Sequence, residues 1–228
     1  MTPANVIALF ATPDVLLRHC YLHIAGGATK SPSLPDAPPP PANGQAPIHT
    51  FKIEIGDQAV EGFTTGISGF IGKRKEREFV KVTKLSGPAK AVLAADEMNA
   101  YYIPMVQTSD VAAGTSHYTL PTAGGPDVMI TSKLSGCRFG VGSDAMGALL
   151  VSHVQPDLTV GSGTRQQDLT TNLTGGFNAV TGTFGIGGAY DEMAAVIGKR
   201  TGAAWKFYCQ ASSYSNSSYQ IDGTTTIG

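Results

Sequence analysis

The sequence predicts one α+β domain with a β-sandwich-like core of mostly antiparallel strands, flanked by a few helices. Three observations point to this class. The chain of 228 residues contains 28 glycines, and charged residues make up only 14% of it. Several short segments alternate apolar and polar residues, as half-buried strands do. Only two or three segments show a helical pattern, so many short strands with few helices are expected.

The first 47 residues are predicted as an arm and a linker. Residues 1–30 form the arm, which is apolar and has a weak helical rhythm. Residues 31–47 contain seven prolines among seventeen positions. Such a stretch supports neither a helix nor a strand ladder, so it is predicted to be an extended linker or surface loop. The arm then either packs back on the body of the domain or leads it. The length of the chain favours a single domain, 1–228.

Strands and two helices are predicted after the linker. Alternating or short apolar runs predict strands at 49–55, 79–85, 127–131, 137–142, 148–154 and 204–213. Residues 89–102 fit a helix that Pro104 ends. Residues 191–200 fit another, with acidic residues at its start and basic residues at its end, where they suit the helix dipole. The polar tail after 212 is either an edge strand or a frayed end.

Charge and hydropathy exclude some function classes. The net charge is −1, so no basic excess is available to neutralise phosphates, and we expect no nucleic-acid binding. No run reaches the roughly 18 apolar residues of a membrane span, so we expect no membrane insertion. The first residues lack a positive region and include Pro3, Pro13 and Asp14. A cleaved Sec signal is therefore not expected, and export would use another route.

The cysteines and histidines predict neither a disulfide framework nor a metal site. The three cysteines, Cys20, Cys137 and Cys209, are widely spaced and form no CxxC pair. Free thiols in a reducing compartment are the simplest interpretation. His19 and His23 flank Cys20 at helical spacing, but no further ligand follows closely. We expect no metal and no cofactor.

Two other motifs carry no chemistry. The glycines of GTFGIGGAYDEM, residues 182–193, place Tyr190 where a dinucleotide-binding loop needs its last glycine, and the stretch lacks the GK[ST] of a phosphate loop. It is predicted as a flexible turn. The chain also lacks the GxSxG of a serine hydrolase elbow.

Cys137 is the strongest candidate for a catalytic residue. Ser135 and Gly136 allow a sharp turn after the strand at 127–131, which places Cys137 at the start of the next strand. Its backbone N–H is then available as an oxyanion donor. The segments 137–142 and 148–154 are predicted to form an antiparallel hairpin. Because paired strands lie about 5 Å apart, the hairpin brings His153 near Cys137.

This spacing leaves two interpretations open. A free thiol with a pKa of about 8.5 is mostly protonated at neutral pH, and a neighbouring imidazole could take its proton and later donate it to a leaving group. Alternatively, Cys137 is a small buried apolar residue and His153 a core histidine with its hydrogen bonds satisfied, since free cysteines are among the most buried residues.

The local motif resembles a known family of toxins. An apolar strand that begins at Asp127 contains Thr131 and is followed by Leu134-Ser135-Gly136-Cys137. A later strand contains Val151-Ser152-His153. This pattern is similar to the glutamine deamidase toxins of the Burkholderia lethal factor and cytotoxic necrotizing factor type. The resemblance covers residues 127–153. The wider spacing from cysteine to histidine and the proline-rich segment depart from Burkholderia lethal factor.

The resemblance implies roles for the residues of the motif. Cys137 would be the nucleophile and His153 the general base and then acid. The main-chain carbonyl of Thr131 would orient the imidazole, as an Asp or Asn does in other triads. Leu134, Ser135 and Gly136 would shape the turn on the oxyanion side. A β-sandwich flanked by helices is also implied.

The function implied is conversion of a glutamine in a target protein to glutamate through a thioester, without a cofactor. The target would be a GTPase or a translation-initiation helicase. The protein would be a monomer, secreted by a non-Sec route and active in the cytosol of a target cell, or otherwise cytoplasmic. A transglutaminase or a cysteine protease could use the same Cys137 and His153. In a non-catalytic β-sandwich binding module, Cys137 would be inert.

Overall fold

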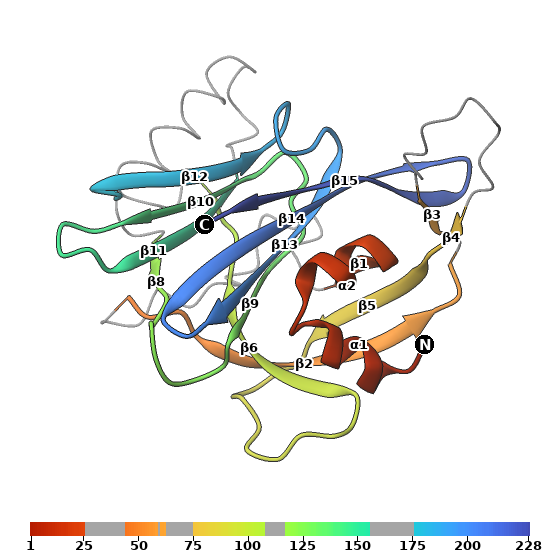
Figure 1. Cartoon of the computed structure of the whole chain (residues 1–228), viewed down its shortest axis with the longest axis horizontal. Coiled ribbons are helices and arrows are strands. Elements are labelled where there is room, and N and C mark those ends of the chain that lie inside the picture. The colour runs from red at the N-terminus through yellow and green to blue at the C-terminus, as the bar shows by residue number, and fades with distance from the viewer. Residues whose placement is uncertain (26–43, 59, 63–74, 108–116, 156–175) are drawn as a thin grey trace.

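The computed structural model describes residues 1–25, 44–58, 60–62, 75–107, 117–155 and 176–228, and it is mostly β with two short helices (Figure 1). The helices are α1 (Pro3–Leu9) and α2 (Pro13–His19). The described strands are β1 (Cys20–Ala25), β2 (Ile48–Gly56), β3 (Val60–Gly62), β4 (Lys75–Glu76), β5 (Glu78–Lys84), β6 (Glu97–Ile103), β7 (Val106–Gln107), β8 (Tyr118–Thr119), β9 (Val128–Thr131), β10 (Arg138–Ser143), β11 (Leu149–Gln155), β12 (Ala179–Gly185), β13 (Met193–Thr201), β14 (Ala204–Ser215) and β15 (Ser218–Ile227). Within these ranges, no helix has the length and apolar character needed to cross a membrane.

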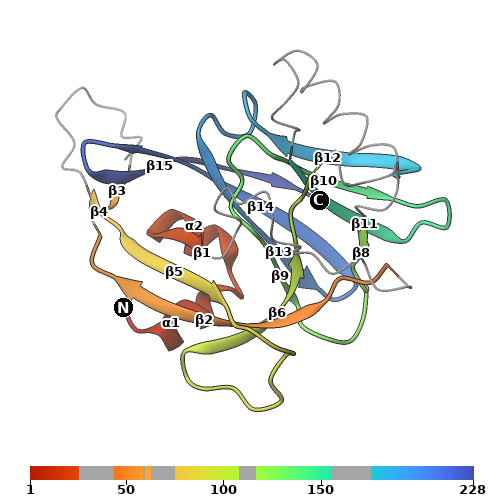
Figure 2. The ribbon, with the colours of Figure 1, turned by 180° about the vertical axis from the view of Figure 1, so that it is seen from behind.

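The strands form two sheets of different size. The main sheet has the order β1-β5-β2-β6-β9-β13-β14-β15-β3-β4 and curls into a nearly closed, barrel-like shape. It is mixed, because β1 with β5, β6 with β9 and β15 with β3 are parallel. The small sheet has the order β12-β10-β11-β7, with β8 also on β11, and it is mostly antiparallel. From behind, β10, β11 and β12 lie together at one end of the molecule, away from α1 (Figure 2).

The prediction of many strands with a few helices is confirmed, and the strands predicted from alternation are present, but the main sheet does not form the predicted sandwich of mostly antiparallel strands. The mixed, curled main sheet was not predicted. Its parallel pairs join segments far apart in the chain, such as Tyr21 with Phe79. Such pairings depend on tertiary packing, and local alternation does not encode them.

The helix predicted at 191–200 is wrong, because this segment is the strand β13. Ala195 and Ile197 belong to one core cluster, and Ala194 and Val196 belong to another. A strand buried on both faces has a continuous apolar run, which cannot be told from a buried helix by periodicity alone.

The helix predicted at 89–102 is also wrong. Its second half is the strand β6, and its first half is a set of turns. The Glu97 carboxylate accepts a hydrogen bond from the Ala94 N–H and pairs with Lys90, which stabilises these turns. Tyr101 and Tyr102 on β6 then face opposite clusters, so both faces of this strand are also buried.

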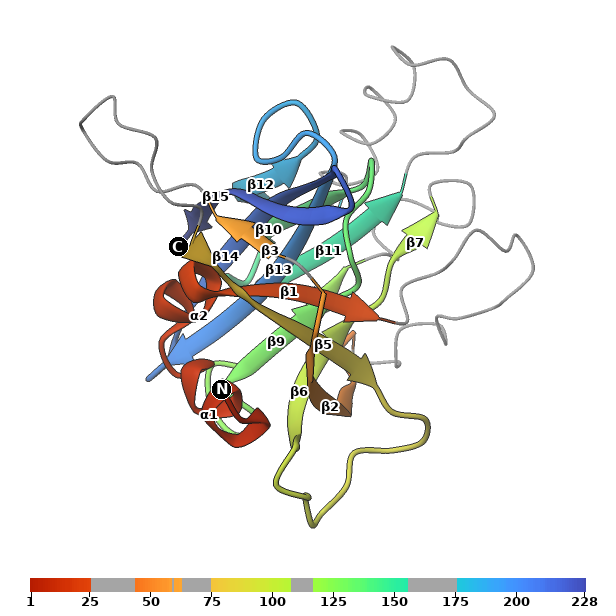
Figure 3. The same ribbon diagram turned by 90° about the vertical axis from the view of Figure 1, so that its right-hand side faces the viewer.

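Residues 1–25 pack against the main sheet. Pro3 and Pro13 lie in the first turn of α1 and α2, where the missing N–H costs no helical hydrogen bond. Val6 and Leu16 are fully buried in the cluster that α1 and α2 share with β2 and β5. α2 leads directly into β1, which runs parallel beside β5 (Figure 3). Of the proline-rich segment, residues 31–43 lie outside the described residues.

Gln210 on β14 helps to close the main sheet through its side chain. Its Nε2 donates to the carbonyls of Leu17 and Cys20, each at 2.7 Å. Its Oε1 accepts from the Leu22 N–H at 2.9 Å. These three buried hydrogen bonds join β14 to α2 and β1, the edge strand at the far end of the main sheet.

A second core lies between the two sheets. It joins Phe139 and Phe184 of the small sheet to Phe207 of the main sheet, with the Phe139 ring centroid 6.3 Å and 5.9 Å from the other two. Cys137 belongs to this cluster. The predicted nucleophile therefore lies at the junction of the two sheets.

Candidate active site

The hairpin predicted around Cys137 is present. β10 and β11 are antiparallel, with Phe139 directly opposite His153. The Asp144 carboxylate accepts hydrogen bonds from the N–H groups of Met146 and Ala148, at 2.9 Å and 2.8 Å. These bonds stabilise the connection between the two strands, as aspartate side chains do in turns.

The register places Cys137 and His153 on the same face of the hairpin. Directly opposed residues share a face, and side chains two positions apart in an extended strand also share one. Cys137 precedes Phe139 by two positions, and both belong to the core between the sheets. Cys137 directly precedes Arg138, the first paired residue of β10. Extending the pairing by one position would make Cys137 and His153 diagonal neighbours, a relation in which residues lie about 7 Å apart.

The turn that carries Cys137 is held on both sides. Leu134 exchanges two backbone hydrogen bonds with Ala194, at 2.8 Å and 2.9 Å. Gly136 has a φ of 84°, which glycine adopts without strain. The buried Tyr190 hydroxyl donates to the Cys137 carbonyl at 2.6 Å. Together these contacts fix the start of β10.

His153 is oriented through Nδ1. Its side chain is 0% exposed. The Thr131 hydroxyl donates to the Ile103 carbonyl at 2.7 Å and lies 2.7 Å from His153 Nδ1. Because a hydroxyl has only one proton, it must accept from an Nδ1–H. Ser132 Oγ lies 3.2 Å from the same nitrogen. The ring is therefore the Nδ1–H tautomer, which leaves a lone pair on Nε2.

Nε2 of His153 is the unusual atom of the site. It is buried, and among the described residues it has no hydrogen-bond partner. Burial lowers the pKa of His153 from 6.5 to about 3, so the ring is neutral at neutral pH. Nε2 therefore has a free lone pair, but burial disfavours the protonated ring, so His153 can act as a base only once the site admits water or a polar partner.

Cys137 is covered in this arrangement. Its side chain is 2% exposed, and its Sγ lies 3.7 Å from Met105 Sδ. Burial raises the pKa of the Cys137 thiol to about 11, opposed weakly by a hydrogen bond from the Ser135 N–H. In the described part of the chain, no hydrogen bond joins Sγ to His153. The thiol and the imidazole are therefore both neutral in the covered site.

The structure brings Thr131 and His153 together, but within the described residues it shows no hydrogen bond between Cys137 and His153. Thr131 contacts His153, and Leu134, Ser135 and Gly136 form the turn before Cys137. The contact from Thr131 differs in detail from the main-chain carbonyl that the resemblance implies, because its side-chain hydroxyl makes it. Sequence reasoning missed Met105, Tyr190 and Ser132. Met105 and Tyr190 are distant in sequence, and no local pattern marks them.

Thr131→Val tests the orienting hydroxyl, since valine has nearly the same shape. We expect a loss of about 1–3 kcal/mol in the free energy of unfolding, because the buried Nδ1–H loses its closest acceptor. Thr131→Ser keeps the hydroxyl and is expected to lose less. Urea denaturation of both variants measures the difference. Equal losses would show that the hydroxyl does not hold the ring.

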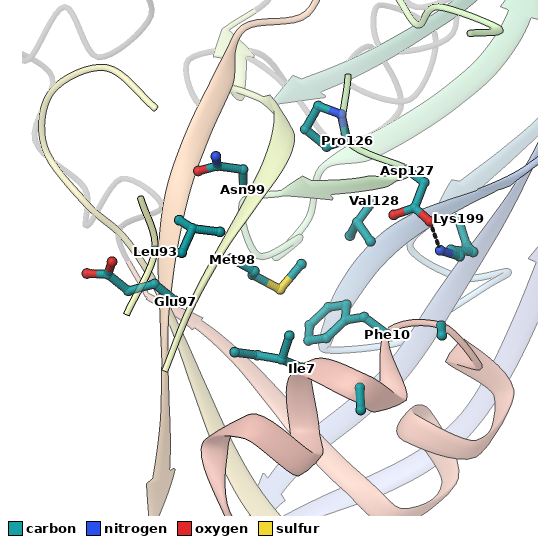
Figure 4. Close-up of a pocket in the computed structure, with 12 residues that line it drawn as sticks. Ile7, Phe10, Leu93, Glu97, Met98, Asn99, Pro126, Asp127, Val128 and Lys199 are labelled. Carbon is teal, nitrogen blue, oxygen red and sulfur yellow. Dashed lines mark hydrogen bonds and ion pairs between the residues drawn. The ribbon is translucent and has the colours of Figure 1, made fainter. Parts of the chain in front are cut away.

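A groove of about 410 Å³ lies elsewhere, between α1 and the β6 and β9 strands (Figure 4). Ile7, Phe10 and Met98 form apolar walls, and the Asp127–Lys199 ion pair lies at its border. Cys137 and His153 do not line it. The groove is therefore separate from the candidate active site.

The described residues contain no group of three or more His, Cys, Asp or Glu side chains placed to hold a metal ion. Comparison with protein-family models and with curated proteins finds no match to this sequence. The support for a function therefore comes from the arrangement of Cys137, Thr131 and His153, together with the motif resemblance.

Proposed function

We propose that this protein is a cysteine-dependent protein glutamine deamidase, with Cys137 as nucleophile and His153 as general base and acid. The observation that carries the proposal is the free lone pair of His153 Nε2, buried on the hairpin face that also carries Cys137. Buried polar groups normally have a hydrogen-bond partner, although among the described residues His23 and His49 also each have one unpaired ring nitrogen. Here one nitrogen is held by Thr131 and the other is left to react.

The first step forms the thioester. Rotation about the Cα–Cβ bond of Cys137 moves its thiol from Met105 toward Nε2, which takes the proton. The thiolate attacks the carboxamide carbon of a glutamine, and the carbonyl oxygen becomes an oxyanion. The Cys137 N–H is a candidate donor to that oxyanion. The imidazolium then protonates the leaving nitrogen, the C–N bond breaks, and ammonia departs.

The second step is hydrolysis. His153, neutral again, takes a proton from water as the water oxygen attacks the thioester carbon. The C–S bond breaks, the thiolate recovers the proton from His153, and glutamate is released. No electrons are transferred to or from an external group, so these residues suffice for the reaction.

The depth of Cys137 supports a side-chain amide as substrate. The thiol of a residue that is 2% exposed and in contact with Met105 is reached more easily by a slim, unbranched side chain than by a peptide backbone. This favours deamidation over proteolysis. Transglutamination would use the same thioester with an amine in place of water, and the motif resemblance favours water.

The resemblance also directs the choice of target. We propose a GTPase or a translation-initiation helicase as the substrate protein. In a GTPase, glutamate in place of the glutamine that orients the attacking water would stop hydrolysis. Secretion by a non-Sec route and action in the cytosol of a target cell belong to the same proposal.

A non-catalytic binding module is the second candidate function. The burial of Cys137 and the raised pKa of its thiol favour it, since both are usual for an inert core cysteine. A binding module, however, gives no role to the free lone pair of His153 Nε2.

Incubation with candidate GTPases and helicases tests the enzyme. Intact and peptide masses of each target should show the increase that replacement of an amide NH₂ by OH gives, without incorporation of an added amine. Cys137→Ala is expected to abolish this change. Cys209→Ala is the matched control, because Cys209 is buried in the same core between the sheets but belongs to β14 and not to the hairpin. Activity that survives in Cys137→Ala would exclude the mechanism.

A further inference from the structure

One short segment contacts Thr131 and Cys137 and pairs with the neighbour of His153. Residues 103–106 cross from β6 in the main sheet to β7 in the small sheet. The Ile103 carbonyl accepts the Thr131 hydroxyl. Met105 Sδ lies against Cys137 Sγ. Val106 pairs with Val154, the neighbour of His153. The crossing therefore covers the site and is part of its frame.

The side chain of Met105 has the shape of a substrate. Methionine and glutamine are both unbranched, and the third side-chain atom is Sδ in one and the reactive Cδ in the other. Met105 Sδ is 3.7 Å from Cys137 Sγ. Reacting atoms in a productive complex lie about 3–3.5 Å apart. The thioether thus lies close to the position that the carboxamide carbon of a bound glutamine would take.

We propose that Met105 is an internal substrate mimic. In the protein without substrate, its side chain occupies the position that the side chain of a target glutamine would take, which we call the glutamine slot. The inference rests on the proposed function and adds two properties to it. First, the slot selects an unbranched side chain whose reactive carbon is the third side-chain atom. Glutamine has its carboxamide carbon at this position, and asparagine, which is one atom shorter, does not. The site also stays closed until a target glutamine replaces Met105.

Closure by Met105 has a physical advantage for this pair of residues. With the thioether in place, water is kept from Cys137, and the thiol stays neutral and unreactive toward oxidants and small electrophiles. Displacement of Met105 would free the sulfur to rotate toward Nε2 of His153. The reactive thiolate would then form when a substrate is present.

Alkylation by iodoacetamide near neutral pH tests the closure. In wild type, Cys137 is expected to react slowly. In Met105→Ala, we expect its rate to rise about tenfold or more, while the rates of Cys20 and Cys209 stay unchanged. Met98→Ala is the matched control, since Met98 belongs to the other core cluster and lines the groove that is separate from the candidate site. An unchanged Cys137 rate in Met105→Ala would overturn the proposal.

Met105→Gln tests the slot directly. The introduced carboxamide carbon would lie at the nucleophile, so the variant is expected to deamidate itself. Water is consumed, ammonia is released, and the mass increase falls on the peptide that contains position 105. The double variant Met105→Gln with Cys137→Ala should keep its amide. Met105→Asn, one atom shorter, should keep its amide as well.

The outcomes separate this inference from the proposed function. A folded Met105→Gln that keeps its amide, beside a wild type that deamidates a target, would overturn the slot and leave the function intact. A Met105→Ala variant with a fast-reacting Cys137 that still deamidates no target would argue against the function. Thermal unfolding of each variant establishes that it is folded.

Discussion

Glutamine in place of His153 is expected to reduce deamidation by about 10²–10⁴-fold, the usual contribution of a positioned acid–base group. The amide keeps a polar group near Thr131 but cannot take the proton from Cys137. The rate of mass change in a target protein measures the loss. His49→Gln is a control, because His49 lies on β2 in the main sheet. Equal losses in the two variants would show that His153 has no special role.

The same His153→Gln variant should change how stability depends on pH. Burial lowers the pKa of His153 from 6.5 to about 3. The folded state therefore holds the ring neutral, while the unfolded chain binds a proton below pH 6.5. This stabilisation is complete above pH 6.5 and is lost as the pH falls from 6.5 toward 3.

At pH 5 the loss of stability is about 2 kcal/mol, since each pH unit below the pKa of the unfolded state costs about 1.4 kcal/mol. Urea denaturation at a series of pH values should show that His153→Gln loses less stability than wild type as the pH falls below 6.5. Equal losses of stability in the two proteins as the pH falls would mean that the ring is not held neutral in the folded protein.

Alanine in place of Gln210 is expected to give the largest loss of stability. The side chain is 1% exposed and makes hydrogen bonds to Leu17, Cys20 and Leu22. Its removal leaves two carbonyls and one N–H unpaired in the core. Each buried unpaired group costs about 1–3 kcal/mol, so for three such groups we expect a loss of at least about 3 kcal/mol in the free energy of unfolding.

Gln220→Ala is the matched control for Gln210. Its amide makes one exposed hydrogen bond, to Ser215, and we expect a change within about 0.5 kcal/mol. Urea denaturation measures both variants. If Gln210→Ala were as stable as Gln220→Ala, the closure of the main sheet would not depend on these side-chain hydrogen bonds.

Much of the strand content was predictable because alternation is a local signal. The segments that became β2, β5, β10, β11 and β14 each have one apolar face or a short apolar run. β6 and β13 were predicted as helices because both of their faces are buried, which removes the alternation. The rule that predicts strands fails where two cores lie on either side of one strand.

The sequence by itself determined the hairpin and hence the shared face of Cys137 and His153, because a tight turn and a period of two operate over a few residues. Tertiary structure alone decided how reactive they are. Met105 covers the sulfur, Thr131 holds Nδ1, and burial keeps both groups neutral. These effects arise where distant strands meet, and desolvation depends on everything packed around a group, which no local pattern records.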